Sequence, residues 1–401
     1  MQMQKIIKSI AITFIFLLGT ISAVEAAEWR FDPVFRIAAD FNDNPLLSIR
    51  TDVDDSASGY MAEGSVKIAY RSETSSFYIT PRFRNSVYGS ETGLDSNDSF
   101  LRMNFSRRTA KTNFRLRGSY SRESTRTAGP DTEFEPEDPD DILDDEVFVV
   151  LGRRERFDLS PTFTYNLSSV NSVWFNLYYT DTRYDDVFAG LLTDYADLRI
   201  NASYYRAMSE RTSAFVTATS RKYQTDRGNN EVNGIGLYVG LDRRLSETSR
   251  LRAMVGVEDT ELAGGESDQN WVADFSFVRR LKTIRILAQY KRTISASGSG
   301  DLGTRDSINL NFSRDLNERI SAGIGARLYS TTALEVGPGS INERSYIQLR
   351  SNITWHISPV FSFDANYRYT FLDRKSVLES SNSNQVTLWI SYHPTSIVRS
   401  R

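Results

Sequence analysis

The stretch Phe-Ser-Phe-Asp-Ala-Asn-Tyr-Arg-Tyr-Thr-Phe, residues 361–371, places an apolar side chain at every odd position and a polar one at every even position. Successive side chains of a β-strand point to opposite faces, so this alternation predicts a strand with one apolar and one polar face. The same pattern recurs from Trp29 to Tyr392 in segments of about ten residues, which is typical of a transmembrane β-barrel. We therefore expect an all-β chain.

The alternation defines about 18 antiparallel strands, and a count of 16 to 20 is compatible with it. The expected strands span residues 29–41, 60–71, 76–88, 98–108, 111–123, 155–167, 171–183, 194–208, 212–223, 231–243, 249–260, 269–280, 283–294, 304–316, 319–329, 345–357, 361–371 and 384–393. Their connections alternate between short and long, as short periplasmic turns and long extracellular loops do in bacterial outer-membrane barrels. Because the count is even, both termini are expected in the periplasm.

Residues 1–26 have the features of a secretory signal peptide, with Lys5 and Lys8 before an apolar core and a small-x-small site at Val24-Glu25-Ala26. No stretch reaches the roughly 20 apolar residues that a transmembrane helix needs. We expect export to the outer membrane of a Gram-negative cell. There residues 27–393 would form the barrel, and residues 394–401 a short periplasmic tail.

The chain lacks the residues that several kinds of catalytic and metal-binding site require. The chain has no cysteine, which excludes disulfides and thiolate sites, and it has two histidines. His356 and His393 fall at strand ends beside short connections, with no Ser/Asp constellation that the sequence identifies. No phosphate-binding loop or paired-histidine motif occurs, and the basic residues are spread around a wall. We expect no enzyme, no cofactor, no metal centre and no nucleic-acid partner.

Strand parity assigns a row of arginines to the barrel interior, because Arg or Lys facing lipid near the midplane costs roughly 2–4 kcal/mol. The predicted pore-lining residues are Arg36, Arg82, Arg84, Arg102, Arg115, Arg117, Arg199, Arg252, Arg285, Arg327, Arg350 and Arg368. Guanidinium groups in a water-filled lumen attract anions and anionic sugars. The same groups could instead pair with lumenal acids such as Asp158, Glu258 and Asp364 and brace the wall. The sequence leaves both interpretations open.

The longest connection, residues 124–154, is strongly acidic, with ten acids and no base between residues 131 and 146. One interpretation folds this extracellular loop into the barrel as a constriction facing the arginines. The other leaves it on the cell surface, solvated or binding a divalent cation through Glu135, Asp138, Asp140 and Asp141. The candidate loop residues are Glu133, Glu135, Glu137, Asp138, Asp140, Asp141, Asp144 and Asp145.

The start of the expected mature chain resembles a known family. Residues 28–33, Glu-Trp-Arg-Phe-Asp-Pro, and residues 40–47, Asp-Phe-Asn-Asp-Asn-Pro-Leu-Leu, are similar to the first strand and turn of outer-membrane β-barrel porins associated with exosortase or exopolysaccharide-export loci. The resemblance implies outer-membrane location and barrel architecture. Implied partners are outer-membrane lipid and lipopolysaccharide, the insertion machinery, and polysaccharide or periplasmic export components. One departure is that His393-Pro394 and further residues follow the last strand, where such barrels commonly end on an aromatic residue.

These patterns predict a passive outer-membrane porin, or a conduit for polar or anionic solutes or saccharide. An alternative is a non-conducting barrel that serves as a surface adhesin or as a scaffold for envelope polysaccharide assembly. A weaker alternative is a barrel hydrolase acting on a surface substrate.

Overall fold

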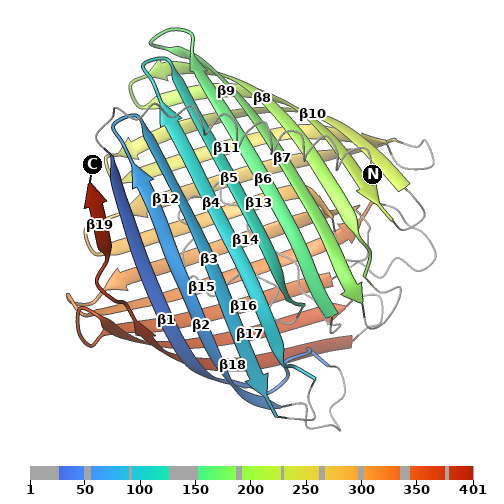
Figure 1. The fold of residues 1–401 in the computed structure, drawn as a ribbon. Helices are drawn as coiled ribbons and strands as arrows, with labels where there is room; N and C mark the ends of the chain where they lie inside the picture. Colours follow the sequence, from blue (N-terminus) through green and yellow to red (C-terminus); the bar gives the residue numbers. More distant parts are fainter. Residues whose placement is uncertain are drawn as a thin grey trace.

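The computed structural model describes residues 27–48, 56–89, 93–125, 152–186, 192–226, 230–261, 267–296, 302–334, 344–374 and 379–400. These residues form one large antiparallel sheet (Figure 1). Its strands are β1 (Glu28–Asn42), β2 (Ala57–Arg71), β3 (Ser75–Tyr88), β4 (Ser96–Arg108), β5 (Thr112–Ser124), β6 (Gly152–Asn166), β7 (Asn171–Asp186), β8 (Tyr195–Ser209), β9 (Thr212–Thr225), β10 (Asn230–Ser246), β11 (Ser249–Glu261), β12 (Ser267–Arg280), β13 (Ile284–Ala296), β14 (Leu302–Asp315), β15 (Ile320–Ala333), β16 (Arg344–His356), β17 (Phe361–Arg374), β18 (Glu379–Tyr392) and β19 (Ile397–Ser400). Within the described ranges, no helix is long and apolar enough to cross a bilayer.

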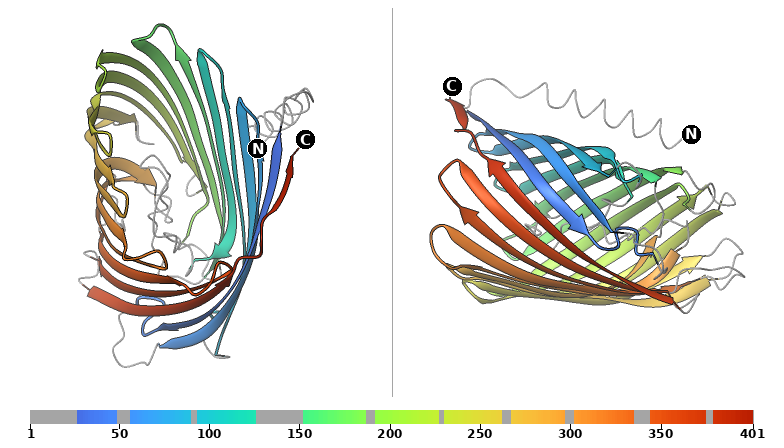
Figure 2. Two further views of the ribbon diagram at one scale, coloured as in Figure 1. Left: turned by 90° about the vertical axis from the view of Figure 1, so that its left-hand side faces the viewer. Right: turned by 90° about the horizontal axis from the view of Figure 1, so that it is seen from below.

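The sheet closes on itself. Each strand from β1 to β17 pairs with the next strand in sequence, and β18 pairs back onto β1 from Phe35↔Tyr392 to Asn42↔Gln385. The prediction of an antiparallel barrel of about 18 strands is therefore confirmed. Figure 2 shows the strands as a wall around a lumen.

Residues 394–401, expected as a tail, contain a further strand. After the break at Pro394, β19 pairs with the start of β1, from Glu28↔Ser400 to Phe31↔Ile397. The first residues of β1 extend past the end of β18, which leaves a strand edge with unpaired backbone groups. The strand β19 covers that edge. The residues that follow the last aromatic position of β18 therefore have a structural role at the barrel seam.

The two faces of the wall differ in chemistry. In β18, Leu388 and Ile390 are exposed, whereas Thr387, Trp389 and Ser391 between and beside them are buried. In β10 the exposed apolar residues are Ile235, Leu237, Val239 and Leu241. The outer surface is thus a continuous apolar belt, and most of the polar side chains lie on the inner face.

The two rims of the barrel differ in the length of the connections between strands. The short connections, from β2–β3 through β16–β17, lie at the short-turn rim, and backbone hydrogen bonds such as Ser72 N–H to Ser75 O at 2.8 Å close them. The opposite end is the long-loop rim, where β5 and β6 are joined by the acidic segment. Its candidate residues, from Glu133 to Asp145, lie outside the described residues, and so do residues 1–26, the expected signal peptide.

Gly256 in β11 lies so close to β10 that there is no room for a side chain at this position. A Cβ atom at this position would overlap the Leu237 carbonyl oxygen and the Tyr238 ring of β10. We expect Gly256→Ala to lower the free energy of unfolding by about 1–3 kcal/mol, the usual cost of overpacking. Urea unfolding followed by electrophoretic mobility measures it. Gly64→Ala is the matched control, because its nearest contact would be the Phe35 ring at an ordinary 3.8 Å; equal losses would contradict the prediction.

Candidate functional site

The inner wall of the barrel is the candidate site, and the predicted arginines lie along it. Nine of them lie on the strand face opposite exposed apolar side chains; they are Arg36, Arg82, Arg84, Arg102, Arg199, Arg252, Arg327, Arg350 and Arg368. Arg115 and Arg117 share a face with Ser119, which hydrogen-bonds to Asp158, and Arg285 shares one with the buried Gln289. Every one of these arginines has an interaction partner.

One group of these arginines surrounds a single buried carboxylate near the seam of the barrel. Glu63 of β2 accepts hydrogen bonds from Arg36 Nη1 at 3.3 Å and from Arg84 Nε at 3.0 Å, and Arg82 Nη1 lies 3.9 Å away. One carboxylate thus faces three guanidinium groups, and Arg82 and Arg84 take part in further interactions as well. Because Glu63 is 6% exposed, the attraction is only weakly screened by water.

Aromatic side chains hold the same guanidinium groups on the inner wall. The Arg82 guanidinium carbon lies 4.1 Å from the centre of the Phe100 ring, and that of Arg36 lies 4.3 Å from the Trp389 ring. Stacking of this kind leaves the edges of the planar guanidinium group available for hydrogen bonds. We refer to Arg36, Arg82, Arg84 and Glu63 as the Glu63 cluster.

A second group, the Asp197 cluster, joins distant parts of the wall. Asp197 of β8 receives two hydrogen bonds from Arg221 of β9, at 2.8 and 2.9 Å, and one from Arg199 Nε at 3.2 Å. Both arginines also donate to the backbone carbonyl oxygen of Ile294 in β13, at 2.9 Å from Arg199 and 3.1 Å from Arg221. This contact therefore joins two strands, β8 and β13, that are not neighbours in the sheet.

The lumen is also narrowed by the segment that follows β1. Leu47 packs against Tyr329, Tyr346 and Leu372 of β15, β16 and β17, and its carbonyl oxygen accepts a hydrogen bond from Arg374 at 3.0 Å. Leu47 has φ 49°, a left-handed conformation that is unusual for a leucine. A residue held in this conformation by packing indicates that the segment is fixed against the inner wall.

Several charged residues of the inner wall were not among the predicted residues. Arg154 pairs with Glu123 at 2.9 Å, and both are buried, as are Arg221 and Asp197. Strand parity could have found Arg221, which lies on the same face as Thr217 and Thr219. The inward direction of Arg221 was hard to recognise because Phe215 and Tyr223 also face inward. The apolar residues of β9 therefore do not mark one face clearly.

The two histidines lie at the short-turn rim, where His393 approaches a serine. Its Nε2 is 3.4 Å from Ser362 Oγ, at the long end of a hydrogen bond. Asp364 instead accepts from Thr354 at 2.6 Å, and no hydrogen bond joins it to His393 among the described residues. Burial lowers the pKa of the His393 ring, an effect that Asp364 opposes. The arrangement lacks the third member that would orient a catalytic base.

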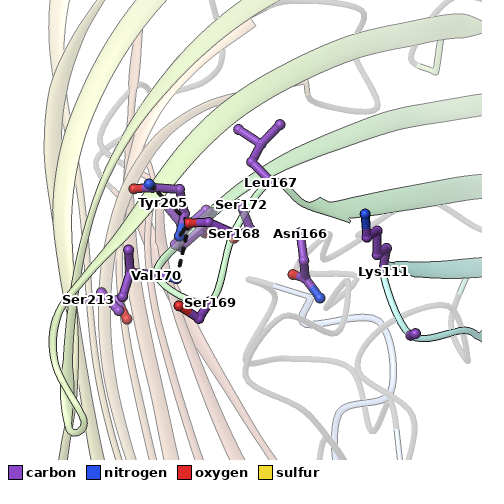
Figure 3. Close-up of a pocket in the computed structure, with 12 residues that line it drawn as sticks. Lys111, Asn166, Leu167, Ser168, Ser169, Val170, Ser172, Tyr205 and Ser213 are labelled. Atoms are coloured by element: carbon purple, nitrogen blue, oxygen red, sulfur yellow. Dashed lines mark hydrogen bonds between the residues drawn. The ribbon is translucent and has the colours of Figure 1, made fainter.

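A pocket of about 540 Å³ lies at the same rim, beside the turn between β6 and β7 (Figure 3). Ser168 Oγ accepts hydrogen bonds from the backbone N–H groups of Val170 and Asn171, so its hydroxyl stabilises the turn itself. The only charged side chain that lines the pocket is Lys111. In the described part of the chain, no group of three or more potential metal-binding side chains occurs.

Comparison with known proteins gives likeness in structure alone. No protein-family model and no curated protein sequence matches the chain. The chain is similar to the outer membrane protein opdK from Pseudomonas aeruginosa, at TM-score 0.49 and 10% identity, covering 92% of this chain and 99% of that one. A BenF-like porin from Pseudomonas fluorescens Pf-5 gives the same four values. The outer membrane channel DcaP of Acinetobacter baumannii follows at TM-score 0.42, 10% identity and coverage of 92% and 97%. Likeness at this level says nothing about a solute.

Proposed function

We propose that this chain is an outer-membrane β-barrel channel that conducts small polar solutes and prefers anions. The observation that carries the proposal is the contrast between the two faces of one closed wall. The outside is an apolar belt suited to lipid, and the inside carries clustered arginines and carboxylates. A soluble protein would hide the belt, because large exposed apolar surfaces lead to association.

The anion preference is proposed from the guanidinium groups of the inner wall, of which three, Arg36, Arg82 and Arg84, surround the carboxylate of Glu63. Their guanidinium groups match the geometry of carboxylate and phosphate oxygens. Anionic solutes or anionic saccharide are therefore the proposed cargo. Lipid and lipopolysaccharide would surround the belt, the insertion machinery would assemble the barrel, and periplasmic export components would be partners for saccharide.

Single-channel recording of the refolded mature protein in a planar bilayer tests this function. We expect discrete conductance steps, and in a salt gradient a reversal potential of the sign that anion preference gives. Protein denatured by heat before addition is the control. Absence of conductance from protein shown to be folded and inserted would overturn the channel.

Deleting residues 131–146 in the same recordings tests the acidic loop as a constriction. A constriction loop of ten acids would change both the conductance and the ion preference when it is removed. An unchanged channel would place the loop on the cell surface, where Glu135, Asp138, Asp140 and Asp141 remain candidates for cation binding.

The contacts between elements that are not neighbours in the sheet favour a second candidate, a non-conducting barrel that acts as a surface adhesin or as a scaffold for envelope polysaccharide. Contacts such as Arg221 to Ile294 and Arg374 to Leu47 fill part of the lumen. A scaffold would give no conductance, and it would lose polysaccharide binding on deletion of residues 131–146. A hydrolase has less support, because His393 and Ser362 lack an orienting carboxylate.

A further inference from the structure

The wall of the barrel is incomplete between β12 and β13 at the long-loop rim. These strands pair from Arg280↔Arg285 to Ala273↔Arg292 and then separate, although β12 continues to Ser267 and β13 to Ala296. The pairing of β13 with β14 continues without a break to Ala296↔Leu302. The outer ends of β13 and β14 therefore leave β12 together, as one two-stranded ribbon.

The ribbon turns into the lumen. Ile294 is fully buried, in one cluster with Tyr195, Tyr223 and Val232 of β8, β9 and β10. Leu302 at the start of β14 belongs to the same cluster. In the left view of Figure 2, orange strand ends project from the wall into the barrel. An apolar contact thus holds the ribbon end against the inner wall at β8, β9 and β10.

One backbone carbonyl group of the ribbon has a different hydrogen-bond partner from the one that a continued pairing with β12 would give it. At the short turn, Leu281 N–H donates to the carbonyl oxygen of Ile284, so even-numbered residues of β13 point their carbonyl groups toward β12. Ile294 has the same parity, and its carbonyl oxygen is an acceptor that a continued β12 ladder would use. Instead it accepts hydrogen bonds from Arg199 and Arg221. The Asp197 cluster satisfies a backbone group that strand separation has released.

Among the described residues, no strand pairs with β12 from Ser267 to Val272 on the side that faces β13. Extending the observed register would pair Trp271 with Ile294 and Asn270 with Ser295. Ser295 Oγ, buried in the present position, has no hydrogen-bond partner. At the branch point the Arg292 guanidinium carbon lies 4.4 Å from the Trp271 ring, and Arg292 pairs with Asp306 at 2.5 Å. This contact keeps the ribbon attached to β12 while its end is displaced.

We propose that the outer ends of β13 and β14 form a gate with two positions. In the closed position, seen here, Arg199 and Arg221 bind the Ile294 carbonyl and the ribbon obstructs the lumen. In the open position the ribbon pairs with β12 from Ser267 to Val272, which completes the wall and widens the lumen. The gate rests on the proposed channel function, and alternative packings of one segment are a known basis of switching.

The chain contains no cysteine, so an engineered disulfide reports the open position without side reactions. Asn270→Cys with Ser295→Cys places two thiols opposite each other only when the ribbon pairs with β12, at a non-hydrogen-bonded position suited to a disulfide. The matched control is Ser276→Cys with Gln289→Cys, the same type of pair on the same two strands, already in register. We expect the control to oxidise readily and the gate pair to oxidise slowly.

Replacing the two arginines that bind Ile294 should shift the equilibrium. With Arg199→Gln and Arg221→Gln added, the gate pair should oxidise on the order of tenfold faster or more, because hydrogen bonds from charged donors are the strong ones. The control pair should not change. In bilayers the oxidised gate pair should conduct more than its reduced form, and reductant should reverse the increase.

Three outcomes decide between the possibilities. A gate pair that never oxidises, in barrels whose control pair does, would overturn the movement. An oxidised gate pair with unchanged conductance would overturn the gate but not the channel. Oxidation that depends on Arg199 and Arg221, in barrels that conduct nothing even when oxidised, would support the movement and overturn the proposed channel.

Discussion

Replacing Asp197 by asparagine is expected to lower the free energy of unfolding by about 3–5 kcal/mol, the cost of removing one partner from a buried ion pair. The carboxylate lies between Arg199 and Arg221, and the Asp197 and Arg221 side chains are almost inaccessible to solvent. Asparagine keeps the shape but removes the buried carboxylate that pairs with both guanidinium groups. Urea unfolding of the folded barrel in detergent, followed by electrophoretic mobility, measures the loss.

The matched control is Asp242→Asn at the short-turn rim. Asp242 also pairs with an arginine, Arg250, but the Arg250 side chain is 60% exposed. Exposed ion pairs contribute about 0–1 kcal/mol, so this variant should differ little from the native barrel. Comparable losses from the two substitutions would show that burial does not strengthen the Asp197 cluster, and would remove the basis for its role in holding Ile294.

The strands could be predicted from sequence because the environment of the wall imposes a strict pattern. A wall between lipid and an aqueous lumen forces every second side chain to be apolar, and this requirement acts on each strand separately. The alternation in residues 361–371 therefore predicts β17 by itself, and the neighbouring strands are not needed for the prediction. The pairing of successive strands follows from short connections, which permit only antiparallel neighbours.

The closed position of the β13–β14 ribbon could not be predicted, because alternation reports which face a side chain is on but not what lies opposite. Ile294 continues the apolar stripe of Ile284 and Ile286 and has the pattern of a lipid-facing residue, yet it is fully buried inside the barrel. Its contacts with Arg199 and Arg221 join residues more than 70 positions apart in sequence. No local pattern contains that information.

The charge balance of the lumen was only partly accessible for a related reason. Glu63, Glu123 and Asp197 are buried acids of the inner wall that the alternation did not mark. Glu63 lies in β2, where small residues such as Ala62 and Gly64 flank it and give little contrast between faces. The structure brings these acids against arginines, so bracing of the wall occurs in the same clusters that would line a channel.

Reversing two charges on the inner face of β5 should reverse the ion preference of the channel. Arg115→Glu with Arg117→Glu exchanges two positive charges for two negative ones on the face that carries Ser119, whose hydroxyl hydrogen-bonds to Asp158. Ion selectivity in wide pores follows the charge of the lining groups. We expect the reversal potential in a salt gradient to move from anion toward cation preference, while conductance steps persist.

The ionic strength of the recording and a matched variant separate a lining role from a general charge effect. At 0.1 M salt the screening length is about 10 Å, so lining charges act on ions throughout a narrow lumen, whereas at 1 M it is about 3 Å and the difference should shrink. Arg243→Glu with Arg244→Glu makes the same charge change on exposed residues where β10 meets the short-turn rim. Equal shifts from both variants would mean that net charge, not the lumen wall, sets the preference. A shift confined to the β5 variant would place Arg115 and Arg117 on the path of the ions, because only charges within a screening length of that path can sort them.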